Sequence, residues 1–594
     1  MYIRVDSQGD PTEDLVCRFP IRNLLSNKTD SEATLTQIKK WEHDCYIDHR
    51  NCRSERLDVP LPTRCIDVSD ESIIRVVERG GDRGQYICLS HQWGKGEMPL
   101  KLTTGTRDDL FSGINAADLP ITFGHAVDVT KRLGCRYLWI DSLCIVQDDK
   151  DDWEREAANM ASIYSNSWLT VAAAAASGPT DGLFKSPDVQ LTDSSPLELS
   201  QSVLPFSVYV RHEPRFEVGH LAGKQEHGLL DRGWVLQERL LSPRVVFFGA
   251  NEVSWECMSC EACSCEPRLT PYELQQYSPR EPMNSKGAFC QAASKVGEER
   301  DMKDGRLLAA WHNVVNAYTG LRLTVATDIF PALAGLARQV GATREGDQYI
   351  AGLWKLTIMQ DLLWRRRTFG DWNESIWSDH YDLQNCFDGG DQGKEKFVQK
   401  LMDQNLLEIK IERELKRRLA PSWSWASLHT QIEYDKEMNL RDFNLTDLEL
   451  AQLVEVNCVH KYETGRLQDP ENSSITMRGR IVAVELRHVE VGNSYESRLI
   501  SNRCVMPFSE TDTGLRSPGS PLKDGARLSC LLVATGKVKE RVHMRKELGL
   551  VLIAQDAETE RCYERVGMFS HAYEIGKELS VFDGVESKSL VQIV

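Results

Sequence analysis

The sequence predicts an α/β fold for residues 81–275, in which a parallel sheet carries helices on both faces. Buried strands alternate with amphipathic helices there, and the strands are apolar along their length, as in sheets that are covered on both sides. The segment 137–149 shows this best, because it begins as an apolar strand and turns acidic at Asp141. Since ligands of parallel sheets bind at the carboxyl ends of the strands, Asp141 is a candidate site residue.

The elements of this core follow one another in a regular order. We expect strands at 85–90, 137–140 and 168–174, and amphipathic helices at 121–133 and 152–164. The spacing of Asp151 and Glu154 predicts a capping box at the start of the second helix. The first strand runs into the turn Ser90-His91-Gln92-Trp93-Gly94. In that turn, His91 could act as an acid or base in a pocket, or only bond to the backbone.

The rest of the chain changes its periodicity twice. We interpret 185–230 as an insertion over the sheet, followed by a helix from Gly233 and strands at 244–248 and 252–257. The expected domains are an N-terminal segment at 1–80, the α/β domain at 81–275, a mainly helical region at 276–440 and a β-rich domain at 441–594. Helical periodicity occurs at 307–317, 329–340 and 394–419, before a Trp-rich turn at 420–427, and apolar–polar alternation occurs at 474–489, 526–535 and 548–555.

Length and charge restrict the classes of function. A chain of 594 residues is too long for one core, which predicts two to four domains. The formal net charge of −17 argues against nucleic acid as a partner, because that requires a concentrated basic face. No apolar run is long enough to span a bilayer, so we expect a cytoplasmic protein without a membrane span. Its 17 cysteines are then expected to be thiols or metal ligands.

A first group of candidate metal ligands lies near the N-terminus. A helix expected at 34–45 ends with Cys45, and His49 and Cys52 come after it, so the three residues are spaced as ligands on a helix end and its following turn. Free thiols and a surface histidine are the alternative interpretation.

A second group follows the strand 252–257. Four thiols lie within nine residues there: Cys257, Cys260, Cys263 and Cys265. Structural zinc is the leading interpretation, ahead of an iron–sulfur cluster or a disulfide. Because so tight a stretch rarely surrounds one ion, the N-terminal group would complete the tetrahedron and join that segment to the α/β domain.

Several long segments resemble a known family in the same order. YICLSHQWG (86–94), LPITFGHAVDVTKRLGCRYLWIDSLCIVQDD (119–149), DWEREAANMASIYSNSWLTVAAAAAS (152–177) and DRGWVLQERLLSPRVVFF (231–248) resemble the motifs of the fungal heterokaryon-incompatibility (HET) domain. DIFPALAGLA, YIAGLWKLTIMQDLLW and APSWSWASL resemble segments that commonly follow it. The resemblance implies a role in non-self recognition and programmed cell death when unlike hyphae fuse. It implies no reaction by itself.

A more distant resemblance, to Toll/interleukin-1 receptor (TIR) domains, suggests a reaction. The order of strands and helices is similar, with the flavodoxin-like arrangement that this implies, although the insertion at 185–230 departs from a compact TIR domain. Trp234 precedes Glu238 by four residues, as a tryptophan precedes the glutamate that enzymatic TIR domains need to cleave NAD+. The resemblance therefore places Glu238 at the catalytic position. Asp141 joins it as a second candidate carboxylate.

The same resemblance assigns a nucleotide-binding loop and a substrate. The candidate binding residues are Ser90, His91, Trp93, Gly94 and Trp234, and NAD+ would be a substrate rather than a cofactor. A fixed carboxylate stabilises the positive charge that develops on the ribose as nicotinamide leaves. Alternatively, Glu238 only pairs with Arg232, Arg239 or Arg244, a contact that contributes little.

Three other groups are alternative candidates for a catalytic or metal-binding role. Glu156 lies near the apolar face of the helix at 152–164, where it is either functional or paired. Cys144 could be a nucleophile with His91 or His125, but its apolar neighbours favour an inert thiol. The acidic run 148–152 is more typical of a helix cap than of a metal site.

Three classes of function remain open from the sequence. The chain is an enzyme that consumes NAD+, or a scaffold that kills without chemistry by assembling with itself or with partners. A protein that modifies a metabolite on a borrowed fold is the third, because fold does not determine function. The expected partners are accordingly a second copy of the chain or another incompatibility protein.

Overall fold

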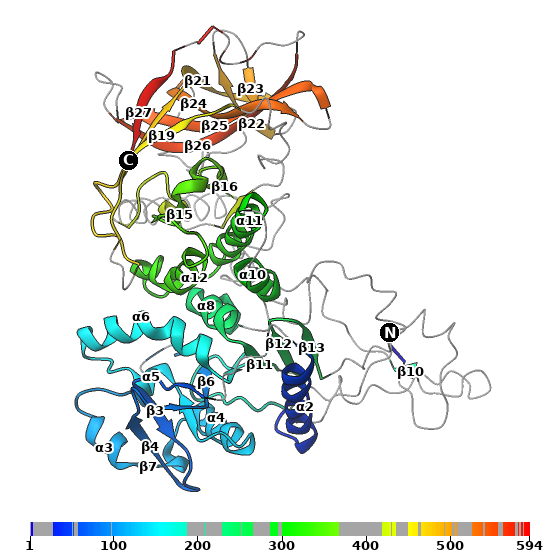
Figure 1. Cartoon of the computed structure of the whole chain (residues 1–594), viewed down its shortest axis with the longest axis vertical. Helices are drawn as coiled ribbons and strands as arrows, with labels where there is room; N and C mark the ends of the chain where they lie inside the picture. Colours follow the sequence, from blue (N-terminus) through cyan, green and yellow to red (C-terminus); the bar gives the residue numbers. More distant parts are fainter. Residues whose placement is uncertain are drawn as a thin grey trace, which may run out of the picture. The chain divides into compact units, whose positions relative to one another are not determined.

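The computed structural model divides the chain into two compact units (Figure 1). It describes residues 2–3, 28–49, 52, 58–94, 96, 98–186, 208–209, 228–250, 252–264, 285–294, 300–366, 419–428, 431–434, 449–460, 465–491, 494–501, 505–507, 525–538, 541–555, 562–575, 580, 582, 584–585 and 587–594. The first unit comprises Met1–Ala310, Leu321–Thr324 and Pro331–Thr343, and the second comprises Trp311–Gly320, Val325–Phe330 and Arg344–Val594.

The first unit is built on a mixed sheet, which has nine strands among the described residues. In spatial order these are β13 (Glu261–Cys263), β12 (Val253–Cys257), β11 (Arg244–Phe248), β9 (Leu169–Ala172), β6 (Tyr86–Ser90), β8 (Tyr137–Trp139), β3 (Arg64–Asp67), β4 (Ile73–Glu78) and β7 (Ile114–Asn115). The four central strands, β11, β9, β6 and β8, are parallel, and the outer strands pair antiparallel. The expectation of a parallel sheet is confirmed for the centre only, because hairpin strands extend the sheet at both edges.

The order of the four parallel strands determines where a ligand can bind. Numbered along the chain, the order across the sheet is 2-1-3-4, which is the order of flavodoxin-like sheets. The chain therefore passes from β6 to β8 on one side of β6, and from β8 it crosses back to β9 on the other side of β6. Right-handed crossovers then place the helix between β6 and β8 on one face and the later helices on the other. Ligands of such sheets bind where the order reverses, here at the carboxyl ends of β6 and β9.

The helices of the first unit lie close to the expected positions. They are α2 (Glu32–Asp48), α3 (Arg107–Ser112), α4 (Ile121–Arg132), α5 (Asp141–Cys144), α6 (Lys150–Asn166), α8 (Gly233–Leu241), α10 (Ser285–Ser294), the first part of α11 (Arg300–Tyr318) and α12 (Pro331–Gly341), with the short turns η1 (Ala116–Asp118) and η2 (Gly228–Asp231). The predicted capping box at Asp151 is wrong, because α6 begins earlier. Its cap is Asp149, whose Oδ1 accepts hydrogen bonds from the backbone N–H groups of Asp151 and Asp152 at 3.0 and 3.1 Å.

Helix α12 packs against α6 and α8 within the first unit. The N–H of Gly335 donates to Oε1 of Gln237 at 2.7 Å, and Nη2 of Arg338 donates to the carbonyl of Ala158 at 2.7 Å. A Cβ atom at Gly335 would lie 2.4 Å from the Cβ of Ala161, so only glycine permits this approach. Helix α12 thus covers α8, the helix that follows β9, although the two are almost 100 residues apart in the sequence.

The second unit contains the β-rich module, whose prediction is confirmed. Its large sheet has ten strands among the described residues: β18 (Glu449–Leu450), β19 (Gln452–Asn457), β20 (Ser474–Gly479), β21 (Ile481–Val491), β22 (Ser494–Ile500), β23 (Val505–Pro507), β24 (Arg527–Val538), β25 (Arg541–Ala554), β26 (Cys562–Glu574) and β27 (Ser589–Ile593). Alternate residues such as Leu528, Cys530 and Leu532 face a common apolar core with Phe569 and Phe582.

Short elements and tryptophans form the rest of the second unit. The elements are η3 (Ala326–Asp328), β14 (Tyr349–Ile350), β15 (Leu353–Trp354), η4 (Lys355–Thr357), α13 (Ile358–Asp361), β16 (Trp364–Arg366), η6 (Trp425–Ser427) and β17 (Ile432–Tyr434). Trp423 and Trp425 are completely buried, in line with the structural role expected for the Trp-rich turn. The guanidinium of Arg565 lies 3.5 Å from the ring centroid of Trp364 and also donates to its carbonyl at 2.5 Å.

Some predicted segments lie outside the described residues. Of the predicted helix at 394–419, residues 394–418 lie outside the described part of the chain. Of the insertion at 185–230, the structure describes only residues 185–186, 208–209 and 228–230. Residues 208–209 form β10 (Val208–Tyr209), which pairs with β1 (Tyr2–Ile3). The remaining short pair of the first unit is β2 (Val59–Pro60) with β5 (Arg83–Gly84). Among the residues that the structure describes, no helix is long and apolar enough to cross a membrane.

Candidate functional site

The carboxyl edge of the central strands brings together the first predicted site residues. Cys88 of β6 pairs with Trp139 of β8, so Ser90 and Asp141, each two residues further on, leave the sheet side by side. Nε1 of Trp93 donates to Oδ2 of Asp141 at 3.0 Å, and Nδ1 of His91 lies 3.6 Å from Oδ1 of the same carboxylate. The turn after β6 is thus tied to the end of β8 through Asp141.

Helix α8 adds Glu238 to this edge. Its side chain is only 7% exposed. Burial raises the pKa of Glu238 to about 7, and the charge of Asp141 acts in the same direction. The nearby hydroxyls of Ser90 and Tyr164 and the positive charge of Arg232 oppose this rise, because they favour the ionised form. Glu238 therefore changes its charge near neutral pH, which is unusual for a carboxyl group and typical of functional sites.

The arginines near Glu238 have other partners. Nη1 of Arg232 donates to the carbonyl of His91 at 2.6 Å. Arg239 forms a bidentate pair with Glu256 at 2.7 and 2.8 Å, and Nη2 of Arg244 donates to the carbonyl of Cys52 at 3.0 Å. Among the described residues, Glu238 forms no ion pair within 4.0 Å, so the simple surface pairing considered from the sequence does not account for it. Arg232, which the sequence offered only as a pairing partner, contacts His91, and its positive charge acts on the pKa of Glu238.

His91 lies under the turn rather than at its surface. It is 4% exposed and contacts the ring of Phe123 edge-on, with centroids 5.1 Å apart. Burial lowers the pKa of His91, as does Arg232, against the opposing charge of Asp141. The imidazole is therefore neutral near pH 7.

Gly94 and Trp234 are the remaining candidate binding residues. Gly94 has a φ of 79° and would bring a Cβ atom within 3.3 Å of Cα of Gly178, which explains a glycine at the end of the turn. Trp234 lies one turn before Glu238 on α8 and is half-buried. The turn after β6 is therefore packed against the loop that follows β9, where the strand order reverses.

Two of the three competing groups, Glu156 and Cys144, are buried. Glu156 is 1% exposed, and its Oε1 lies 3.9 Å from Arg64 and 3.8 Å from Arg155. Burial raises the pKa of Glu156. Cys144 is buried as well, and burial raises the pKa of its thiol to about 12, which agrees with an inert thiol.

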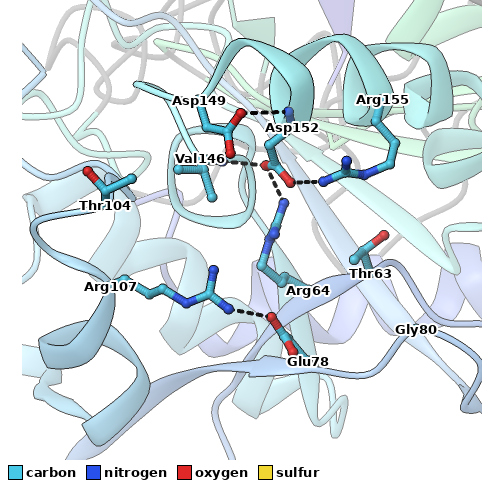
Figure 2. A pocket seen from close by; sticks show the side chains of 10 residues that line it. All are labelled: Thr63, Arg64, Glu78, Gly80, Thr104, Arg107, Val146, Asp149, Asp152 and Arg155. Atoms are coloured by element: carbon cyan, nitrogen blue, oxygen red, sulfur yellow. Dashed lines mark hydrogen bonds and ion pairs between the residues drawn. The ribbon is translucent and has the colours of Figure 1, made fainter.

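A pocket of about 450 Å³ lies beside Arg64 and Arg155, the two arginines near Glu156 (Figure 2). Its lining is strongly polar and consists of Thr63, Arg64, Glu78, Gly80, Thr104, Arg107, Val146, Asp149, Asp152 and Arg155. Neither Glu238 nor Asp141 lines it. At its base, Nη2 of Arg64 meets Oδ2 of Asp152 at 2.5 Å, and that oxygen also accepts from the N–H of Val146 at 2.8 Å. Sequence reasoning missed this pair, because the two residues are 88 positions apart.

We expect the buried pair of Arg64 and Asp152 to be important for stability. Replacing Asp152 with asparagine should destabilise the first unit by about 3–5 kcal/mol, because Arg64, 4% exposed, would lose its closest charge partner and keep only Glu156, at 3.9 Å. Urea unfolding followed by far-UV circular dichroism measures this effect. Asp151→Asn is the control, since Asp151 is exposed on the same helical turn. Equal unfolding midpoints for the two variants would contradict the prediction.

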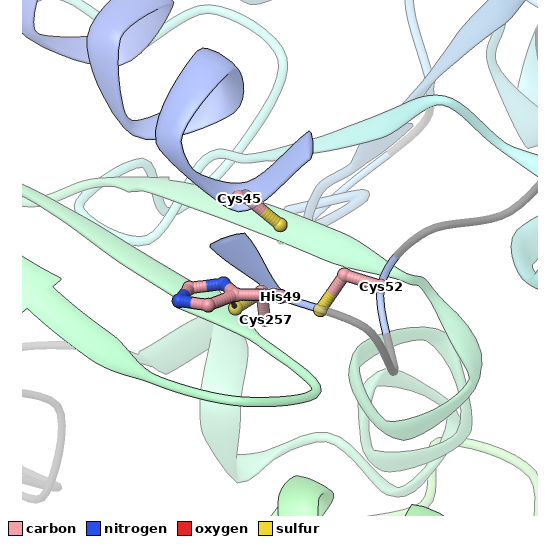
Figure 3. A group of neighbouring side chains, drawn as sticks. All are labelled: Cys45, His49, Cys52 and Cys257. Atoms are coloured by element: carbon pink, nitrogen blue, oxygen red, sulfur yellow. Dashed lines mark hydrogen bonds between the residues drawn. The ribbon is translucent and has the colours of Figure 1, made fainter. Parts of the chain in front are cut away.

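A separate set of side chains gathers where the end of α2 meets the end of β12, and Figure 3 shows its four members. The ligand atoms of Cys45, His49, Cys52 and Cys257, here called the Cys/His cluster, lie within 4.8 Å of one another and could hold a metal ion. Sγ of Cys257 lies 3.4 Å from Nδ1 of His49. The structure thus joins the two groups of ligands that the sequence suggested.

The other predicted thiols have different positions. Sγ of Cys260 lies 3.6 Å from Sγ of Cys257 but is not part of the Cys/His cluster. Cys263 is buried in β13, and Cys265 lies outside the described residues. The cluster therefore takes one ligand from the C-terminal group and three from the N-terminal one.

Local structure explains why these four residues meet. Helix α2 ends where the N–H of His49 donates to the carbonyl of Cys45 at 3.3 Å, and the N–H of Cys52 donates to the carbonyl of His49 at 3.0 Å. These turns bring the three side chains to one side of the helix end. The ring centroids of Trp41, on α2, and Trp255, on β12, are 6.2 Å apart, so the helix packs on the strand that ends in Cys257.

Comparison with known proteins gives one result for this part of the chain. Residues 86–238 match the family model described as "Heterokaryon incompatibility protein (HET)". The match begins at the first residue of β6 and ends at Glu238, so it contains the whole cluster at the carboxyl edge. Neither the curated proteins nor the solved structures gave a match. The match supports a role in heterokaryon incompatibility.

Proposed function

We propose that the chain, whose residues 86–238 form a HET domain, is a fungal non-self recognition effector that triggers cell death by hydrolysing NAD+. The observation that carries this proposal is Glu238. It is a buried carboxyl group with a pKa of about 7, at the edge where ligands of this strand order bind.

The proposed reaction needs few groups. Nicotinamide leaves the ribose as a neutral base, so no general acid is required, and positive charge develops on the sugar. The carboxylate of Glu238 would stabilise that charge and orient the attacking water, whose oxygen bonds to the ribose carbon while its proton passes to solvent. The hydroxyls of Ser90 and Tyr164 act on this carboxyl group and would donate hydrogen bonds to its ionised form, which would hold it in position.

The neighbouring groups fit roles in binding. Trp93 and His91 flank Asp141 at the mouth of the sheet, and the indole N–H of Trp93 fixes that carboxylate. Asp141 is 26% exposed and would meet the solvent side of a nucleotide. Because His91 and Glu238 are nearly closed to solvent, we propose that self-association opens and orders the site, as many enzymes complete their sites only on closure or assembly.

The cofactor in this proposal is structural zinc, bound by the Cys/His cluster. Three sulfur ligands and one imidazole are a donor set that zinc accepts in tetrahedral structural sites. The metal would take no part in NAD+ cleavage and would hold α2 against β12.

Nicotinamide release by the purified chain tests the proposed function. The assay should be run at high protein concentration, and with a crowding agent, because the site is expected to need assembly. Release of nicotinamide in proportion to NAD+ loss is the expected result. Absence of turnover under all these conditions would overturn the enzymatic proposal.

We expect the rate to depend on pH through Glu238. The raised pKa of about 7 means that the carboxylate is mostly protonated at pH 6 and mostly ionised at pH 8. If the ionised form acts, kcat/KM should fall about tenfold between pH 8 and pH 6. Initial rates across this range measure the effect, and a rate that stays constant down to pH 5 would assign the catalysis to a group with an ordinary pKa.

A scaffold function is the second candidate. The observation that favours it is the burial of His91 and Glu238, which leaves little of the proposed site open to a nucleotide in this conformation. In that case the HET domain would kill by assembling with itself or with another incompatibility protein. Cell death that persists in the Glu238→Gln variant would favour this candidate.

A further inference from the structure

The pocket shown in Figure 2 has no part in the proposed reaction, since neither Glu238 nor Asp141 lines it. Its volume of about 450 Å³ is that of a site for a small molecule. The lining comes from segments around β3, β4, α3 and the beginning of α6, and most of it is arginine, aspartate, glutamate and threonine. The polar groups of these residues therefore decide which ligand the pocket can hold.

Three guanidinium groups reach the pocket from different sides (Figure 2). Nη2 of Arg64, on β3, and Nη2 of Arg155, on α6, both donate to the carboxylate of Asp152. Nη2 of Arg107, on α3, donates to Oε1 of Glu78 at 2.7 Å. The Nη1 atom of each arginine has no hydrogen-bond partner among the residues that the structure describes. Each guanidinium therefore keeps N–H donors for a ligand.

Arg64 is the fixed member of these three arginines. It is only 4% exposed, its Nε donates to the carbonyl of Cys144 at 2.7 Å, and its Nη2 donates to Asp152 at 2.5 Å. These two bonds hold the plane of the guanidinium before any ligand arrives, which lowers the entropic cost of binding. The side chains of Arg107 and Arg155 are 43% and 58% exposed, so they can adjust to a ligand from the rim.

The carboxylates of the lining leave room for an anion. Both oxygens of Asp152 already accept hydrogen bonds from the chain. Oδ1 of Asp149 caps α6, whose N-terminus carries a partial positive charge. Oε2 of Glu78 and Oδ2 of Asp149 accept no hydrogen bond from the described part of the chain. These two oxygens remain as acceptors for hydroxyl groups of a ligand.

The unused groups require a ligand that is rich in acceptors and also carries hydroxyls. A phosphate group suits arginine because its oxygens accept parallel hydrogen bonds from one guanidinium. None of the ten lining residues is aromatic, so the pocket offers a nucleobase no ring on which to stack. We propose that this pocket binds the phosphate ester of a small polyhydroxylated molecule, such as a sugar phosphate. This inference depends neither on NAD+ cleavage nor on zinc.

Isothermal titration calorimetry of the full chain with ribose 5-phosphate tests the proposal. We expect ribose 5-phosphate to bind and ribose, which has no charged group, to give no measurable heat. Inorganic phosphate, which has no sugar hydroxyls, should bind at least about tenfold more weakly. Equal affinities for the two phosphates would overturn the recognition of hydroxyl groups. Absence of binding at millimolar ribose 5-phosphate would overturn the whole proposal.

Variants of the two rim arginines locate the bound ligand. Arg107→Gln and Arg155→Gln should each weaken the binding of ribose 5-phosphate about tenfold, because each loses a charge-assisted hydrogen bond to phosphate. Arg107→Lys, which keeps the charge, should bind more tightly than Arg107→Gln. The ion pairs of both arginines lie at the surface, so the variants should fold, as unchanged melting temperatures would verify.

Arg83→Gln is the matched control. Arg83 is 56% exposed and pairs with Asp58 at 3.0 Å, but it does not line the pocket. We expect this variant to bind ribose 5-phosphate as the wild type does. Equal affinities of Arg83→Gln, Arg107→Gln and Arg155→Gln would overturn the assignment of the pocket, since the sugar phosphate would then bind elsewhere on the chain.

Discussion

Nicotinamide release by the Glu238→Gln variant is expected to fall at least about a hundredfold relative to the wild-type chain. Glutamine keeps the size of the side chain but cannot carry the negative charge that stabilises the developing positive charge on the ribose. Because the proposed binding residues lie mainly in the turn after β6, the loss should be in kcat rather than KM. Steady-state kinetics at pH 8, where Glu238 of the wild type is ionised, measures it.

The matched control is Glu156→Gln. Glu156 is also a buried carboxyl group with a raised pKa, but it lies beside Arg64 and Arg155, away from the proposed site. We expect its variant to keep most of the turnover once its folding has been verified. Equal losses in both variants would mean that a general effect on the fold, rather than catalysis, explains the result.

Thermal unfolding of the Glu238→Gln variant tests whether its loss of turnover comes from lost chemistry or from a less stable fold. Burial raises the pKa of Glu238 from 4.5 to about 7, so ionisation above pH 7 disfavours the folded state. This destabilisation is absent below pH 4.5, grows as the pH rises and is complete above about 7. The Glu238→Gln variant should therefore be more stable than the wild type at pH 8, by an amount on the order of 3 kcal/mol, and equally stable at pH 4.

Local patterns were sufficient to predict the strand ends that carry the candidate site. The apolar run ending in Asp141 predicted β8, and the run ending in Ser90 predicted β6. The antiparallel direction of the flanking strands was not predicted, because the direction of a short strand such as β3 depends on its neighbours in the sheet. The pair of Arg64 and Asp152 was missed for the same reason, since nothing near either residue indicates the other.

The set of metal ligands could likewise be predicted only in part from local sequence patterns. Spacing identified the N-terminal group and the C-terminal group, but the choice of Cys257 over Cys260 and Cys263 depends on the hairpin of β12 and β13.

The Cys/His cluster is connected to the helix that carries Glu238. Cys257 follows Glu256 directly, and Glu256 holds Arg239 of α8 by two hydrogen bonds. Arg239 is in turn the residue after Glu238. A metal that fixes the end of β12 would therefore also limit the movement of α8, so loss of the metal should reach the proposed site through this buried ion pair.

Replacing Cys257 with serine is expected to abolish zinc binding and to unfold part of the first unit. Structural zinc contributes about 10–16 kcal/mol of binding free energy in small zinc domains, and this energy is available only to the folded form. Even a fraction of it, lost from a unit of this size, should lower the melting temperature by on the order of 10 °C or more. Differential scanning calorimetry combined with metal analysis measures both effects. Removal of zinc from the wild type by a chelator should reproduce them.

Cys260→Ser is the control that decides which thiol binds the metal. Its sulfur lies 3.6 Å from that of Cys257 but outside the Cys/His cluster, so this variant should keep one zinc ion and most of its stability. Loss of zinc in Cys260→Ser with retention in Cys257→Ser would reverse the ligand assignment. Retention of zinc in both would mean that the three N-terminal ligands suffice. The metal could then no longer connect α2 to β12, and the proposed connection to α8 through Glu256 would fail with it.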